Sequence, residues 1–194
     1  MTNPDENLER LNSLGAGEAE TELLKCCGST GWARAVAARR PFGDAGELFR
    51  AAEEVWWNLT EGDWLEAFAA HPKIGSRRGA AARTQHAEAE AWSEQEQSGT
   101  RDAAVDTLDE LAAANRAYEA KFGHIYIVCA TGKTAAEMLA LLRTRLSNPA
   151  AAELRNAATE QSKITRLRLE KLLESQVKAG SQVPSPESQV SSRE

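Results

Sequence analysis

Apolar residues recur at helical spacing along almost the whole chain, and this periodicity limits what the chain can fold into. Ala, Glu, Leu and Arg, which favour helices, dominate the segments that carry it. The pattern predicts an all-α fold: a single-domain helical bundle of about eight helices. The expected helices lie at Glu18–Cys26, Gly31–Ala38, Ala45–Asn58, Asp63–Ala70, Arg83–Ala91, from about Ser93 to Phe122, Thr134–Leu146 and Pro149–Gln176.

Three helix ends carry capping signals. Asp63 is the predicted N-cap of its helix, because a short polar side chain there can bind the free N–H groups of the first turn. Thr134, with Glu137 three residues later, has the pattern of a capping box. Gly123 is expected to end the long helix, as a C′ glycine does.

One short run, Ile125-Tyr126-Ile127-Val128-Cys129, departs from the helical pattern. It is rich in β-branched residues, but the sequence offers no second strand to pair with it. We therefore expect an extended buried segment or the start of a helix. An extended backbone inside a helical bundle leaves N–H and C=O groups unpaired, and these groups could serve a ligand.

The two ends of the chain differ in composition from its body. The first ten or so residues are polar and are expected to be loosely ordered. After about Lys178 the chain turns to Gly, Ser, Gln, Val and Pro, which predicts a disordered tail at 178–194. The folded part is expected to cover residues 8–177. This length is typical of a single domain.

Composition argues against several classes of protein. A net charge of -6 disfavours broad nucleic-acid binding, and no apolar run approaches the ~20 residues that span a bilayer. No spacing of His and Cys suggests a metal site. The three cysteines and the absence of a signal-like start predict reduced thiols inside a cell. The terminal Ser192-Arg193-Glu194 is not a peroxisomal address, so a cytoplasmic location is expected.

The segment His71-Pro72-Lys73-Ile74-Gly75 follows a predicted helix and contains one of three histidines. Proline disfavours the α conformation of the residue before it, so the His71 backbone is expected to be extended. An imidazole at a helix end can reach a cleft, and its ordinary pKa suits acid–base chemistry. On spacing alone, a helix stop with an incidental histidine is the favoured interpretation.

The segment Ser93-Glu94-Gln95-Glu96-Gln97 has two interpretations. Ser-x-x-Glu is a capping box, in which Ser93 caps a helix and Glu96 binds the serine N–H, and local physics favours this interpretation. Alternatively, a helix N-terminus here presents N–H groups and polar side chains to an anionic ligand. The two interpretations agree for Ser93 and compete for Glu96.

Two arginines lie in the last predicted helix, on either side of Leu167. At ~100° per residue, Arg168 falls well inside the apolar arc of the helix, whereas Arg166 falls just past its edge. A buried arginine needs an anion or a carbonyl as partner. A substrate carboxylate would satisfy Arg168, as would a structural ion pair, and Arg168 is therefore the better site candidate.

Taken together, the motifs resemble those of the 2-oxo-4-hydroxy-4-carboxy-5-ureidoimidazoline (OHCU) decarboxylase family. The resemblance extends over roughly residues 8 to 175. It is carried, in chain order, by Trp32-Ala33 with Arg40-Pro41-Phe42, His71-Pro72-Lys73-Ile74-Gly75, Ser93-x-x-Glu96-Gln97, Asn115-x-x-Tyr118-x-x-Lys121-Phe122-Gly123, Ile127-Val128-Cys129, and Lys163-Ile164-x-x-Leu167-Arg168-Leu169.

The resemblance implies an all-α homodimer that uses no cofactor and no metal. It implies decarboxylation of a small ureidoimidazoline, the last unstable intermediate of urate oxidation, to (S)-allantoin. His71 and Glu96 are then the expected catalytic residues. The expected substrate-binding residues are Pro72, Ser93, Gln97, Val128 and Arg168.

The residue types agree with this chemistry. After loss of CO2 the conjugated ring of the substrate can absorb the electron density, so the protein has to orient groups and deliver one proton. We expect His71 to shuttle protons and Arg168 to bind an anionic or carbonyl group. Glu96 would either hold the imidazole tautomer or contact the substrate hydroxyl.

Three other functions compete with this interpretation. A non-catalytic helical binding module would use the same motifs as caps and core. A decarboxylase of a related ureide would keep His71 and Arg168 and change the polar contacts around Ser93 and Gln97, since fold does not fix substrate. A hydrolase acting one step earlier, on 5-hydroxyisourate, is usually associated with a β-rich fold, which the helical pattern opposes.

Overall fold

All regular elements in the described part of the chain are helices. The computed structural model describes residues 4–73, 87–96, 98 and 105–174. Nine α-helices and no strand occur among them, which confirms the predicted all-α fold. They are α1 (Pro4–Ser13), α2 (Ala16–Cys26), α3 (Thr30–Ala37), α4 (Ala45–Trp57), α5 (Glu61–Ala69), α6 (Ala87–Glu96), α7 (Val105–Phe122), α8 (Ala135–Arg145) and α9 (Ala150–Glu174).

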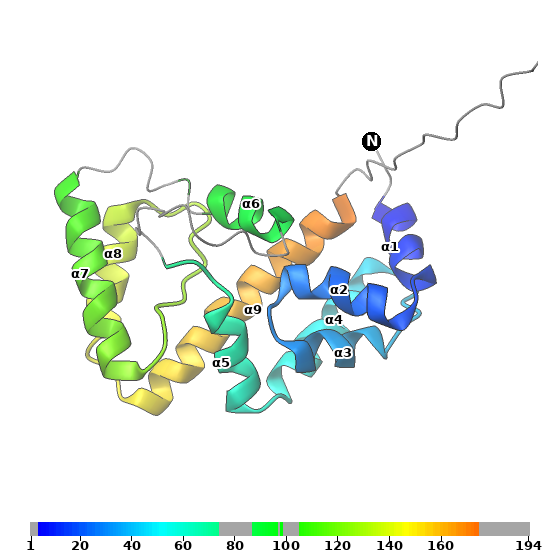
Figure 1. Ribbon diagram of the computed structural model, residues 1–194, viewed down its shortest axis with the longest axis horizontal. Coiled ribbons are helices and arrows are strands. Elements are labelled where there is room, and N and C mark those ends of the chain that lie inside the picture. The colour runs from blue at the N-terminus through cyan, green and yellow to red at the C-terminus, as the bar shows by residue number, and fades with distance from the viewer. Residues whose placement is uncertain (1–3, 74–86, 97, 99–104, 175–194) are drawn as a thin grey trace, which may run out of the picture.

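The 25-residue helix α9 organises the fold. It runs diagonally through the molecule, with α1 to α4 gathered toward one end and α7 and α8 toward the other (Figure 1). Helices α1, α2, α4, α5 and α7 all pack against it. Ten of its residues are buried, so α9 takes part in the core along most of its length.

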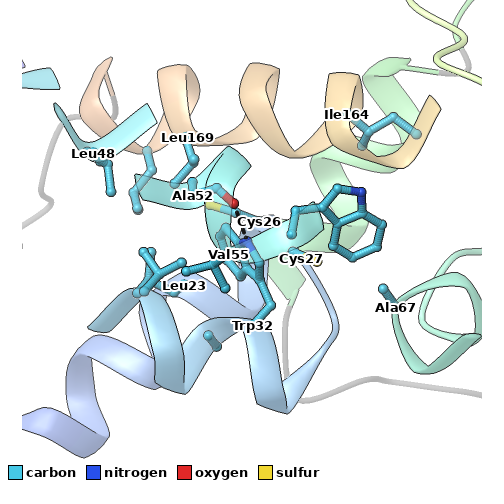
Figure 2. Packing of buried hydrophobic residues seen from close by; sticks show 14 of the residues in the cluster. Leu23, Cys26, Cys27, Trp32, Leu48, Ala52, Val55, Ala67, Ile164 and Leu169 are labelled. Atoms are coloured by element: carbon cyan, nitrogen blue, oxygen red, sulfur yellow. Dashed lines mark hydrogen bonds between the residues drawn. The ribbon is translucent and has the colours of Figure 1, made fainter. Parts of the chain in front are cut away.

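The larger hydrophobic core lies between α2, α3, α4 and α9. Figure 2 shows Leu23, Val55 and Leu169, from three of these helices, converging on one apolar centre. Two buried indoles also bind backbone: Trp32 Nε1 donates to the Ala52 carbonyl and Trp56 Nε1 to the Ala158 carbonyl, each at 3.0 Å. These bonds satisfy the polar end of each ring, so the full apolar area can be buried.

A second core, between α7 and α8, surrounds the extended run. Tyr118 of α7 and Met138 of α8 are fully buried here against Tyr126. At its edge the carboxylate of Glu153, with no exposed surface, accepts hydrogen bonds from the Tyr118 hydroxyl and from Arg145 Nε. A buried carboxylate with these partners fixes α9 relative to α7 and α8.

The first helix corrects one expectation. Residues 4–13 form α1, where a loosely ordered start was expected. Leu8 and Leu11, three residues apart, share one face and are buried. Asn7 Nδ2 donates to the Leu173 carbonyl at 2.7 Å, which ties α1 to the end of α9. Because 166 residues separate Asn7 from Leu173, the sequence around Asn7 does not predict this contact.

The predicted caps are confirmed at two of three helix ends. Thr134 and Glu137 form the expected capping box of α8, and Gly123 has a left-handed φ of 75° after α7. The cap of α5 differs from the prediction. Thr60 is its N-cap, and Asp63 occupies the third helical position, where its carboxylate binds the Thr60 N–H at 3.0 Å.

The region around residue 93 also corrects the prediction. A helix was expected to start at about Ser93 and to run to Phe122, but Ser93 lies inside α6, which begins at Ala87. Val105–Phe122 form α7, and residues 97 and 99–104 lie outside the described residues. Residues 83–86 of the helix predicted at Arg83–Ala91 lie outside the described residues, as does the predicted tail at 178–194. No helix in the described ranges is long and apolar enough to cross a membrane.

Candidate active site

A small pocket collects five of the seven predicted site residues. It lies where the end of α5, the helix α6, the extended run and α9 meet. His71, Pro72, Ser93, Glu96 and Val128 line it, and Arg168 contacts two of them from α9. Gln97 lies outside the described residues. The complete lining consists of His71, Pro72, Ser93, Glu96, Tyr126, Ile127, Val128, Ala130 and Ile164.

His71 sits directly after α5. That helix ends at Ala69, and the His71 N–H still binds the Phe68 carbonyl at 3.1 Å before Pro72 ends the helical path. Desolvation lowers the pKa of the imidazole to about 3, the positive charge of Arg168 adds to this shift, and Gln161 opposes it. The ring is therefore neutral near pH 7 and able to accept a proton.

Ser93 and Glu96 share one face of α6 and point to α9. Arg168 Nε donates to Glu96 Oε1 at 3.0 Å, and Arg168 Nη2 donates to Glu96 Oε2 at 2.8 Å and to Ser93 Oγ at 2.9 Å. All three residues are at most 8% exposed, and Lys171 adds a second cation 3.6 Å from the carboxylate. This is a bidentate, water-excluded ion pair.

These contacts correct the interpretation of Ser93-x-x-Glu96 as a capping box. Because α6 begins at Ala87, Ser93 lies in its last turns and cannot cap its start. The spacing of three residues instead places both side chains on one face of the helix, where they bind Arg168. Arg168 lies inside the helix arc as predicted, whereas Arg166 is exposed and pairs with Glu170.

The run from Ile125 to Cys129 is extended and buried, as expected, and side chains fix its backbone. Arg145 Nη1 donates to the Ile127 carbonyl at 2.8 Å. The Cys129 N–H donates to Glu160 Oε2 at 2.8 Å, and Lys133 Nζ donates to the Cys129 carbonyl at 2.7 Å. Arg145 and Glu160 were not predicted, because 18 and 31 residues separate them from the backbone groups that they bind. Lys133, only four residues from Cys129, was not predicted either.

The neighbouring cysteines offer no nucleophile. Cys26 and Cys27 are fully buried, near enough to Arg168 for its charge to act on both thiols. Burial raises the pKa of Cys27 to about 11, so its thiol stays protonated near neutral pH. No group of His, Cys, Asp and Glu able to hold a metal ion occurs among the described residues.

The fold and the pocket together define a class of protein: an all-α protein with a small pocket lined by an imidazole and by a carboxylate that a buried guanidinium holds. The chain matches the family model described as OHCU decarboxylase over residues 12–170. It therefore belongs to the OHCU decarboxylase family, which confirms the resemblance seen in the motifs.

Three relatives illustrate the relationship. The chain is 38% identical over 175 residues to the uric acid degradation bifunctional protein TTL of Arabidopsis thaliana; the match covers 90% of this chain but 53% of that protein. This chain thus spans about half the length of the plant relative. It is 29% identical over 145 residues to an OHCU decarboxylase of Amia calva, covering 73% of this chain and 79% of the relative. A crystal structure of OHCU decarboxylase in the presence of (S)-allantoin superimposes with a TM-score of 0.68 at 38% identity, covering 79% of this chain and 98% of that one.

Proposed function

We propose that this protein decarboxylates 2-oxo-4-hydroxy-4-carboxy-5-ureidoimidazoline to (S)-allantoin in urate degradation. Membership of the family supports the proposal, as does the likeness to an OHCU decarboxylase whose structure was determined with (S)-allantoin. The observation that carries it is the convergence of His71, Glu96 and Val128, from three separate parts of the chain, on one pocket beside Arg168.

His71 is the proposed proton shuttle. When the bond from C4 to the carboxylate breaks, CO2 leaves, and the electron pair of that bond passes into the conjugated ring of the substrate. The neutral imidazole would first take a proton from the 4-hydroxyl and later return it to the decarboxylated intermediate on one face, while solvent supplies the second proton that neutral allantoin requires. Burial keeps the pKa of this ring well below its ordinary value, so the ring is neutral near pH 7 and one of its nitrogens has a free lone pair.

Glu96 and Arg168 are proposed to orient the substrate. Arg168 holds the Glu96 carboxylate bidentately, so the carboxylate has one fixed position at the pocket wall before any ligand arrives. A fixed carboxylate can accept the hydrogen bond of a substrate hydroxyl without reorganising. The positive charge behind it favours the anionic substrate. Ser93, Gln97, Pro72 and the backbone near Val128 complete the proposed substrate contacts.

The reaction needs no cofactor in this proposal, because the substrate ring supplies the electron sink. We include a homodimeric assembly and a cytoplasmic location in the proposal, on the basis of the resemblance described above. The three cysteines, which are free, are compatible with a reducing compartment.

A coupled circular dichroism assay tests the proposal. Urate is oxidised by urate oxidase and hydroxyisourate hydrolase, and the signal of (S)-allantoin is followed with and without this protein. We expect rapid growth of a single-handed signal. Arg168→Ala should abolish the effect, whereas Arg166→Ala, a matched change two residues away on the exposed face, should retain it. Racemic product formed at the uncatalysed rate by the wild-type protein would refute the proposed function.

A further inference from the structure

Gln161 is a buried polar residue that the proposed chemistry leaves unused. It lies on α9 with no exposed surface. On this helix it precedes Ile164, which lines the pocket, by three residues and Arg168 by seven, so all three share the inward face.

The two ends of the Gln161 amide have different environments. Its Nε2 donates to Thr165 Oγ1 at 3.3 Å, one turn further along the same helix. Its Oε1 completes no hydrogen bond among the described residues, although it is buried. A buried carbonyl without a donor is costly, and native proteins retain such a group where it serves a second purpose. An unsatisfied acceptor beside an active site therefore needs a donor that arrives or turns toward it.

The imidazole of His71, which lines the pocket after the end of α5, can supply such a donor. The Gln161 side chain lies close enough to this ring to favour its protonated form, the effect that an accepting carbonyl has on an imidazolium. No carboxylate has this effect on the ring. Glu96 is held by Arg168 and Lys171, and Lys73, next to Pro72, pairs with Glu119 of α7. The charge facing His71 is thus the cation of Arg168, which opposes protonation.

We propose that Gln161 is the positioning residue of His71: its Oε1 accepts the N–H of one ring nitrogen and so presents the other nitrogen, unprotonated, to the substrate. Because Nε2 is bound to Thr165 Oγ1, the carbonyl is the end of the amide that remains to accept a hydrogen bond. When His71 takes up a proton in turnover, the same carbonyl binds the imidazolium, which no neighbouring carboxylate can do. This inference rests on the proposed function for its catalytic consequence, but the hydrogen bond itself does not depend on the substrate.

The tautomer of His71 gives a direct test. The chain has three histidines, so 15N spectra of the labelled full-length protein are simple, and His71→Asn assigns the signal. We expect the wild-type protein to show one neutral tautomer for His71 near pH 7. Gln161→Leu, which keeps the volume and removes the acceptor, should give a mixture of both tautomers. Gln161→Glu should raise the pKa of His71 toward neutrality, because it places an anion beside the ring.

Turnover provides the second measurement. We expect kcat of Gln161→Leu to fall by at least about tenfold with KM little changed, a part of the ~10²–10⁴-fold that a general base contributes. Thr165→Val should act in the same direction. Thr159→Val is the control, because Thr159 is exposed on the same helix and its hydroxyl binds the Arg155 carbonyl. If Gln161 only fills space in the core, Gln161→Leu will leave the tautomer of His71 unchanged. That result would overturn the proposal, even if the protein proves to act on another substrate.

Discussion

Replacing Arg168 by Ala should destabilise the protein far more than the same change at Arg166. Arg168 is 5% exposed and donates three hydrogen bonds, two to Glu96 and one to Ser93. Its removal leaves the carboxylate of Glu96 buried, with Lys171 at 3.6 Å as the remaining cation. Arg166 is more than half exposed and makes a pair with Glu170 across one helical turn.

The two substitutions differ in the free energy of unfolding that they remove, because only Arg168→Ala leaves its partner carboxylate buried. Breaking a buried ion pair by removing one partner costs about 3–5 kcal/mol, because an uncompensated charge stays in a medium of low polarity. Lys171 lies near enough to reduce this cost, so we expect the lower part of that range for Arg168→Ala. An exposed helix pair contributes about 0.3–0.5 kcal/mol, which sets the expectation for Arg166→Ala.

Urea unfolding, followed by tryptophan fluorescence, measures both values. The double variant Glu96→Gln/Arg168→Ala should recover part of the loss, because it removes the orphaned charge as well. Equal losses for Arg168→Ala and Arg166→Ala, or no recovery in the double variant, would refute the assignment of a buried, mutually dependent pair. That result would also weaken the argument that Arg168 fixes the position of Glu96 in the site.

Three further predictions concern the site and the frame that holds it. The pKa of His71 is held near 3, below the 6.5 of an ordinary histidine, so between these pH values the unfolded chain binds a proton that the folded chain does not. The free energy of unfolding should be at its full value above about pH 6.5 and fall by about 1.4 kcal/mol per pH unit as the pH drops toward 3. Urea titrations at several pH values should show no such component for His71→Asn. Glu160→Gln should raise KM, because a neutral amide accepts the Cys129 N–H more weakly and the run from Ile125 to Cys129, which lines the pocket, becomes less rigid. An unchanged KM in steady-state kinetics would contradict this prediction. Thr60→Ala should lower the free energy of unfolding by about 1 kcal/mol through loss of the α5 cap, measured against Thr159→Val, which removes no cap.

Much of the helical frame could be predicted from local pattern. The bounds of α2, α3, α4, α5, α8 and α9 lie within about two residues of the predicted ones, because apolar residues recur at helical spacing within each segment. Helix α1 was missed since its two buried leucines give a weak stripe and its anchor, the Leu173 carbonyl, is distant in sequence.

In the site, too, single residues could be predicted from local sequence, whereas contacts between distant residues could not. The motifs identified His71 and Arg168, and the helix arc placed Arg168 inward correctly. Local pattern could not show that Glu96 turns to Arg168, because 72 residues separate them. It suggested a capping box instead, which is what Ser-x-x-Glu forms when it stands at the start of a helix. Gln161 was missed for another reason: a single amide in a helix resembles a surface residue until its burial is known.

The most direct measurement follows product chirality with His71→Asn in place of the wild-type protein. The intermediate is generated from urate in a single turnover, and the circular dichroism signal of allantoin is recorded beside the far-ultraviolet spectrum that reports the helices. If His71 is the proton shuttle, the folded variant will leave the intermediate to decay at the uncatalysed rate and give racemic product, whereas the wild-type protein gives (S)-allantoin. Rapid formation of (S)-allantoin by His71→Asn would contradict the proposed role of His71.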